Sequence, residues 1–128
     1  MPRPSSSQPT EVELQILAVL WERGPSSVRQ VHEVLAETRD TGYSTTLKMM
    51  QVMLEKGLLL RDDAVRPQLY RAAKSQEKTQ TQMVDDLTKR AFHGSAMHLV
   101  MNMVSSGRLS ADQLNELKRL IDEGEQDV

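Results

Sequence analysis

Hydroxyl, cationic and apolar side chains recur on one face of a segment in the first half of the chain. The segment runs from about Thr45 to Lys56, and Ser44 before it is a residue type that often caps a helix. At about 100° per residue, a helix here would bury one apolar face. That buried face would consist of Leu47, Met50 and Leu54. The outward face would consist of Thr45, Lys48, Met49, Val52 and Lys56.

These residue types suit contact with a DNA duplex. The hydroxyls of Thr45 and Thr46, with the free backbone N–H groups of a first helical turn, can meet a phosphate. Lys48 can reach a phosphate or a guanine edge, and Met49 and Val52 can touch thymine methyl groups. The alternative is a face that is simply solvated, which would leave the two apolar side chains exposed without a purpose. The predicted contacts from this helix are Ser44, Thr45, Thr46, Lys48, Met49, Val52 and Lys56.

The basic side chains are concentrated around this segment. The whole chain has a formal net charge of -2, but six Lys and Arg stand against three Asp and Glu between Tyr43 and Lys74, a balance of +3. The flanking parts, 1–42 and 75–128, carry -2 and -3. Arg66, with Arg61 and Arg71 nearby, would supply cations to phosphates or a minor groove. We therefore add Arg66 to the predicted DNA contacts.

Helical periodicity and chain breakers predict the elements that would position these residues. Capping pairs, Thr10 with Glu13 and Ser27 with Gln30, predict the starts of two helices, and a third is expected over about 45–56. Two short strands, 58–60 and 68–71, would flank a charged turn, with Pro67 delaying the second. Three helices and a hairpin form a winged helix-turn-helix. We predict a mainly α protein with a flexible N-terminus (1–9), this domain (10–74) and a C-terminal helical domain (75–128).

The C-terminal segment has three narrow apolar stripes separated by glycines. Ser110 and Gln113 form a capping box for the last helix, and Gly124 is expected to end it. Such stripes make a poor core on their own, so pairing with a second copy is predicted. The expected dimerisation residues are Met83, Leu87, Phe92, Met97, Val100, Met101, Val104, Leu114, Leu117, Leu120 and Ile121.

Other classes of function fit the sequence poorly. The chain has no cysteine, and His93 and His98 would point about 140° apart on a continuous helix, so we expect no metal site and no cofactor. No nucleophile elbow, phosphate-binding glycine loop or HExxH string is present, which argues against an enzyme. The longest apolar run, Ile16 to Trp21, is too short to insert into a membrane. A cytoplasmic protein is expected.

The ordered combination of several strings resembles the penicillinase repressor family of the BlaI and MecI type. The strings are Glu13-Leu14-Gln15-Ile16-Leu17, Leu20-Trp21, Val28-Arg29-Gln30-Val31, Tyr43-Ser44-Thr45-Thr46-Leu47 and Leu54-Glu55-Lys56-Gly57-Leu58. The resemblance extends from about Thr10 to Glu123. It implies a winged helix that reads an operator dyad in double-stranded DNA, a helical dimerisation domain, and repression of antibiotic-resistance or stress genes.

The resemblance also implies a route of induction. Members of the β-lactam branch are cleaved at an Asn-Phe bond in the dimerisation domain, in a pathway with a membrane sensor metalloprotease. Asn102-Met103 resembles that site, with Met103 in place of Phe. The copper-responsive branch has a C-terminal cysteine cluster, which this chain lacks.

The leading hypothesis is therefore a homodimeric transcriptional repressor on a palindromic operator. The alternative is a winged helix that contacts only proteins, with Met49 and Val52 docking a partner. Salt-sensitive duplex binding would distinguish the two.

Overall fold

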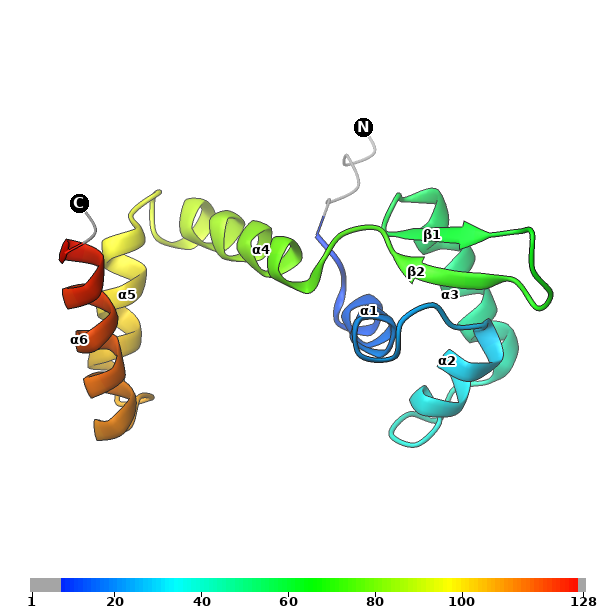
Figure 1. Cartoon of the computed structure of the whole chain (residues 1–128), viewed down its shortest axis with the longest axis horizontal. Helices are drawn as coiled ribbons and strands as arrows, with labels where there is room; N and C mark the ends of the chain where they lie inside the picture. Colours follow the sequence, from blue (N-terminus) through cyan, green and yellow to red (C-terminus); the bar gives the residue numbers. More distant parts are fainter. Residues whose placement is uncertain (1–7, 127–128) are drawn as a thin grey trace. The chain divides into compact units, whose positions relative to one another are not determined.

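The computed structural model describes residues 8–126, which contain helices and one two-stranded antiparallel sheet (Figure 1). In chain order the elements are α1 (Glu11–Arg23), α2 (Val28–Leu35), α3 (Tyr43–Glu55), β1 (Leu59–Asp62), β2 (Leu69–Ala72), α4 (Gln76–Ala91), α5 (Ala96–Ser105) and α6 (Ala111–Gln126). The predicted mainly α fold, with a winged helix-turn-helix followed by a helical segment, is confirmed.

The chain divides into two compact units after Met83, rather than at Lys74. The first turns of α4 belong to the first unit. Thr79 in these turns is buried, and Lys74 Nζ donates to Gln82 Oε1 at 3.2 Å. Trp21 Nε1 also donates to the carbonyl of Lys74 at 3.0 Å. Of the predicted flexible N-terminus, residues 1–7 lie outside the described part of the chain.

Reciprocal capping boxes begin three of the helices, as predicted. At α1, the N–H of Glu13 donates to Thr10 Oγ1 at 3.2 Å and the N–H of Thr10 donates to Glu13 Oε1 at 2.9 Å. Ser27 with Gln30 does the same for α2, and Ser110 with Gln113 for α6. Each pair satisfies two backbone N–H groups that have no partner inside the helix, which fixes where the helix starts.

Two predicted helix ends are wrong. Ser44 is not a cap, because α3 begins at Tyr43 and its N-cap is Gly42, whose carbonyl accepts from the N–H of Thr46 at 3.2 Å. Gly124 does not end α6, which continues to Gln126. A glycine lowers helix stability without forbidding the helical conformation, so the preceding turns carry the helix past it.

The hydrophobic core lies within the first unit and joins α1, α2, α3, β1 and β2. Its buried members are Ile16, Leu17, Val19, Leu20, Val28, Val31, Leu35, Met50, Met53, Leu59 and Tyr70. The buried face of α3 is therefore formed by Thr46, Met50 and Met53, and the predicted Leu47 and Leu54 are only partly buried beside it. The buried stripe is rotated by part of a turn from the predicted one.

The wing is the hairpin of β1 and β2, with Leu60 opposite Arg71 and Arg61 opposite Tyr70. Gly57 has φ +82°, a left-handed conformation that suits glycine and turns the chain from α3 into β1. Ser26, just before α2, exchanges backbone hydrogen bonds of 2.9 and 2.8 Å with Tyr70. The wing is thus tied to the start of α2.

Candidate nucleic-acid interface

The outward face of α3 is polar over most of its length. Ser44, Thr45 and Lys48 are exposed, as predicted, and they lie in the first half of the helix. Lys48 has no ion pair within residues 8–126, so its ammonium is available to a ligand. Gln51 is exposed three residues after Lys48 and therefore lies on the same side of the helix.

Thr46 was expected on the surface, and this expectation is wrong. Its side chain is 0 % exposed, its hydroxyl donates to the carbonyl of Gly42 at 3.4 Å, and its oxygen lies 3.2 Å from His32 Nδ1. A hydroxyl can be buried at little cost when it is hydrogen-bonded. Thr46 therefore belongs to the packing between α2 and α3, and its hydroxyl cannot meet a phosphate.

The apolar part of the expected ridge is not freely exposed. Met49 is partly buried and packs against the hydrophobic core, and Val52 is partly buried as well. Met49 therefore has a packing role in the domain and is not exposed without a purpose. Part of the Val52 surface remains accessible.

Lys56 is exposed, as predicted, but it forms an ion pair with α1. Its Nζ lies 2.9 Å from Oε2 of Glu13, a residue that is only 6 % exposed. Burial opposes ionisation of Glu13, but hydrogen bonds from the Thr10 N–H and from Lys56 hold its pKa below the ordinary value of 4.5. Lys56 is thus bound to a partner inside the domain, and the predicted five-residue ridge is shortened.

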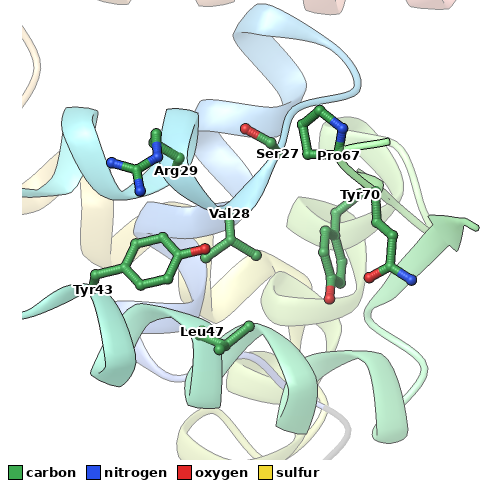
Figure 2. Close-up of a pocket in the computed structure, with 8 residues that line it drawn as sticks. Ser27, Val28, Arg29, Tyr43, Leu47, Pro67 and Tyr70 are labelled. Atoms are coloured by element: carbon green, nitrogen blue, oxygen red, sulfur yellow. The ribbon is translucent and has the colours of Figure 1, made fainter. Parts of the chain in front are cut away.

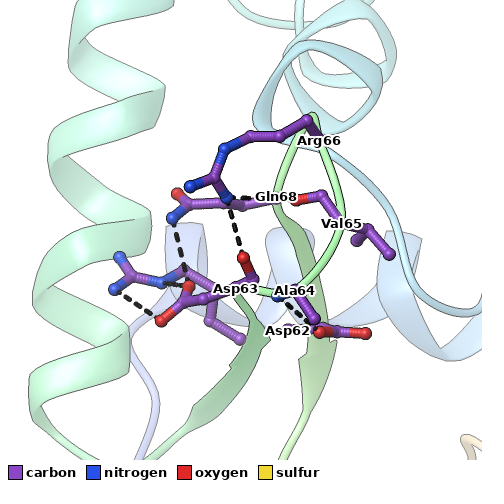
Figure 3. Close-up of polar contacts among 7 residues, drawn as sticks. Asp62, Asp63, Ala64, Val65, Arg66 and Gln68 are labelled. Carbon is purple, nitrogen blue, oxygen red and sulfur yellow. Dashed lines mark hydrogen bonds and ion pairs between the residues drawn. The ribbon is translucent and has the colours of Figure 1, made fainter.

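The three arginines of the wing differ in how freely their guanidinium groups can bind a ligand. Arg66 is exposed at the loop, where its Nη1 donates to the carbonyl of Asp63 at 2.8 Å (Figure 3). Arg61 is paired with the carboxylate of Asp63, and its guanidinium lies 6.0 Å from the centre of the Tyr70 ring. Arg71 is exposed on β2. Arg66 and Arg71 are therefore the wing cations that a phosphate can reach.

A pocket of about 250 Å³ lies between the start of α2, the first half of α3 and the part of the wing from Pro67 to Tyr70. It is lined by Ser27, Val28, Arg29, Tyr43, Leu47, Pro67, Gln68 and Tyr70 (Figure 2). The guanidinium of Arg29 lies 5.3 Å from the centre of the Tyr43 ring, whose other neighbour is His32 at 5.8 Å, edge to face. Helix-turn-helix, pocket and wing therefore form one surface with hydroxyl, amide and guanidinium groups.

Sequence reasoning missed Arg29, Tyr43, Gln51 and Gln68 on this surface. For Gln51 a signal existed, since residue 51 follows Lys48 at helical spacing. For Arg29 and Gln68 the sequence holds no such signal, because only the packing of α2 and the wing against α3 brings them to this surface.

The second unit, from Val84 onward, has its predicted dimerisation residues largely uncovered. Met97, Val100, Met101 and Val104 on α5 are exposed, as are Leu87, Leu120 and Ile121, with Met97 at 68 %. Phe92, Leu114 and Leu117 are partly buried. Among the described residues of this unit, no apolar side chain is buried, so its helices lack a core of their own. Met83, also partly buried, belongs to the first unit.

The proposed cleavage bond lies inside a helix. Asn102 and Met103 belong to α5, and the carbonyl of Asn102 accepts from the N–H of Ser106 at 3.0 Å. Both side chains are exposed. The bond is accessible at its side chains, but its backbone is held in helical hydrogen bonds.

No group of three His, Asp or Glu side chains that could hold a metal ion occurs among the described residues. His98 contacts the Phe92 ring edge to face at 5.4 Å. In the same part of the chain, no helix is both long and apolar enough to cross a bilayer.

The fold and this surface define a winged helix-turn-helix protein. The family model described as penicillinase repressor matches residues 9–123, and the chain belongs to that family of transcriptional repressors. The transcriptional regulator BlaI of Mycobacterium tuberculosis, strains CDC 1551 and H37Rv, is 33% identical over 117 residues, which cover 88% of this chain and 82% of that protein. The penicillinase repressor of Bacillus licheniformis is 22% identical over 116 residues, covering 91% of each.

Proposed function

We propose that this repressor binds operator DNA as a homodimer, with α3 in the major groove and the wing on the adjacent backbone. The observation that carries the proposal is the exposed row of Ser44, Thr45 and Lys48 on α3, in the same domain as the exposed Arg66. A helix of this kind is what a helix-turn-helix inserts into the major groove, with base contacts made by its N-terminal half. Membership of a repressor family supports this assignment.

Each exposed group has a role in the proposal. Ser44 and Thr45 bind backbone phosphates, Lys48 binds a guanine edge or a phosphate, and Val52 touches a thymine methyl group. Gln51 joins them, since an amide can bind adenine through two hydrogen bonds. Thr46, Met49 and Lys56 are left out, because Thr46 is buried, Met49 packs on the core and Lys56 is paired with Glu13.

Selection from a random duplex library, followed by gel-shift titration at several salt concentrations, tests the proposal. We expect a recovered sequence that binds at least about a hundredfold more tightly than an unrelated duplex, with affinity falling as salt rises. Absence of duplex binding even at low salt would contradict the proposal and favour a protein-contact module. That alternative has lost support, since Met49, one of its two docking residues, packs on the core.

The proposal of a homodimer rests on the uncovered apolar side chains of the second unit. Met97 and Met101 lie one turn apart on α5, and Leu120 and Ile121 are exposed on α6. A second copy of the same segment offers the same apolar surface in return, as a two-fold interface requires. The mass of the purified protein in solution tests this part of the proposal. We expect the mass of a dimer, and a monomer at micromolar concentration would contradict it.

A two-fold dimer predicts a palindromic operator. Two copies of α3 would read half-sites whose centres are separated by one helical turn of DNA, about 10 base pairs, or by a multiple of it. Inverted repeats in the selected duplexes, and loss of binding when about half a turn of DNA is inserted between them, are the expected results. Full binding to a single isolated half-site would contradict this arrangement.

We also propose that cleavage after Asn102 induces the controlled genes. Because the bond lies inside α5, we expect cleavage only after local unfolding of that helix. Membranes containing a candidate sensor metalloprotease would be mixed with the purified chain and the products analysed by mass spectrometry. A fragment ending at Asn102 is expected, and an intact chain, or cleavage only elsewhere, would contradict the assignment.

A further inference from the structure

The carboxylate of Asp63 joins both sides of the wing loop. Its Oδ1 accepts from Arg61 Nε at 2.5 Å and from Gln68 Nε2 at 3.1 Å, and its Oδ2 accepts from Arg61 Nη2 at 3.3 Å (Figure 3). Arg61 belongs to β1, and Gln68 directly precedes β2. One side chain therefore fixes the loop to the strands on either side of it.

The backbone of the same residue holds Arg66. The carbonyl of Asp63 accepts from Arg66 Nη1 at 2.8 Å, and the same nitrogen lies 3.3 Å from the carbonyl of Val65. The Nε and Nη2 groups of Arg66 make no hydrogen bond within the described residues, so they are available to an anion. The guanidinium is thus oriented by a residue whose own orientation is fixed by its carboxylate.

Arg61 anchors this arrangement to the domain. Its guanidinium lies 6.0 Å from the centre of the ring of Tyr70, which is buried in the core. Its hydrogen bond to Asp63, with a smaller contribution from Tyr70, raises the pKa of Arg61 above its ordinary value. Arg61 therefore connects the wing loop to the hydrophobic core.

A carboxylate is unfavourable near DNA phosphates, because like charges repel. A carboxylate at position 63 would therefore favour DNA binding only through another effect that outweighs this repulsion. Ordering a loop before binding removes the conformational entropy that binding would otherwise have to overcome. We propose that Asp63 is a positioning residue for DNA binding, which fixes the wing loop so that Arg66 presents its free N–H groups to a backbone phosphate. This inference rests on the proposed DNA-binding function.

The chain offers a matched control in Asp62. Asp62 and Asp63 are adjacent, so Asp62→Asn and Asp63→Asn remove the same charge from nearly the same place. Asp62 Oδ1 accepts the N–H of Ala64 at 3.0 Å, and an asparagine oxygen can keep that bond. In Asp63→Asn, the remaining oxygen can still accept from Arg61 and Gln68, but the ion pair is lost and an NH₂ donor replaces Oδ2, the acceptor for Arg61 Nη2, so Arg61 and the loop are held less firmly.

The first measurement is affinity for the selected duplex by gel shift. We expect Asp62→Asn to bind as tightly as the original chain or more tightly, because a repulsive charge is lost. Asp63→Asn should bind roughly 3- to 10-fold more weakly than Asp62→Asn, the cost of ordering one or two side chains on binding. Equal affinities of the two variants would overturn the inference.

The second measurement shows whether Asp63 acts through Arg66. Arg66→Ala is combined with each Asp variant, and the fold-loss is compared in a double-mutant cycle. We expect Arg66→Ala to weaken binding clearly in the Asp62→Asn background and only slightly in the Asp63→Asn background. The same loss in both backgrounds would show that Asp63 does not position Arg66.

A third measurement needs no DNA. Backbone order parameters from NMR are expected to fall at residues 64–66 in Asp63→Asn but not in Asp62→Asn, while the melting temperatures of both stay close to that of the original chain. Unchanged order in Asp63→Asn would overturn the inference. If the original chain binds no duplex at all, the proposed function itself fails, which is a different outcome from equal binding by the two variants.

Discussion

Thr46 and Lys48 are two positions apart on α3, yet only Lys48 can reach a ligand. Thr46 has no exposed surface, whereas Lys48 is exposed and unpaired in the described part of the chain. A second lysine of the same helix region, Lys56, is held by Glu13. At the residue scale, burial and bonding partners within the domain decide whether a polar side chain of this helix can bind DNA, and the residue type alone does not.

Lys48→Ala tests the base contact. If Lys48 binds a guanine edge, the substitution costs about 1–3 kcal/mol of affinity for the selected duplex and little for an unrelated duplex. Gel-shift titration of both duplexes measures the difference, with Lys78→Ala on exposed α4 surface as the control. An equal loss on both duplexes would instead identify Lys48 as a phosphate contact.

Arg66→Ala tests the wing contact. Since Arg66 is proposed to bind a phosphate, its loss weakens binding to all duplexes alike and lowers the slope of log affinity against log salt by about 1. Titrations at salt concentrations between about 50 and 200 mM measure this slope. Arg90→Ala, which removes an exposed arginine paired with Asp86 in α4, is the control and should leave the slope unchanged.

Glu13→Gln tests the buried ion pair through its pH dependence. The pKa of Glu13 is lowered by folding, so its carboxylate stabilises the fold above the ordinary value of 4.5, and this contribution is lost as pH falls through the lower folded value. At pH 7 we expect the substitution to reduce the free energy of unfolding by about 1 kcal/mol, since Gln can keep the cap but loses the charge.

Urea titrations from neutral to acidic pH measure this effect. The difference between the original chain and Glu13→Gln should shrink as pH falls below 4.5, whereas Glu11→Gln, an exposed neighbour, should differ little at any pH. A difference that stays constant with pH would show that the ion pair does not stabilise the fold.

At the scale of elements, local sequence patterns determine where the helices lie along the chain. Contacts between distant residues determine which face of each helix is buried. The capping box of Ser27 and Gln30 lies within four residues and was predictable as a local pattern. The rotation of α3 that buries Thr46 and Met53 depends on contacts with α2 and the core, so periodicity alone assigned its buried face incorrectly. Elements are thus more predictable than the surfaces they present.

Ser27→Ala is expected to destabilise the first unit. The hydroxyl of Ser27 accepts the N–H of Gln30 at 3.2 Å, and its loss leaves that donor without its cap. We expect a fall of roughly 1 kcal/mol in the free energy of unfolding, measured by urea denaturation. Ser44→Ala is the matched control because Ser44 is not the cap of α3, and an equal loss in both variants would contradict the role of Ser27.

At the scale of the whole molecule, the two units differ in how they bury apolar surface. The first unit contains the entire set of buried apolar side chains, and the described residues of the second contain none. A segment of this kind gains stability when a partner covers its apolar side chains. The proposed homodimer follows from this difference between the units.

Met101→Lys tests the dimer. Met101 is 60 % exposed on α5, and a charge placed in a dimer interface without a partner would have to be desolvated. We expect the dimer dissociation constant to rise at least about tenfold, measured by sedimentation equilibrium, with weaker binding to a palindromic duplex. Asn102→Lys, on the neighbouring position of the same helix, is the control, and an unchanged dimer in Met101→Lys would place the interface elsewhere.

The amino-acid sequence by itself determined the features that depend on neighbours a few residues apart. These are the order of helices and strands, the three capping boxes, the Lys48 face of α3 and the ordered strings that resemble the family. Only the tertiary structure decided which groups are free. Lys56 is paired with Glu13, 43 positions away, Thr46 is covered by α2, and Arg29 and Gln68 join the surface of α3. Such contacts depend on how elements pack, which no local pattern specifies.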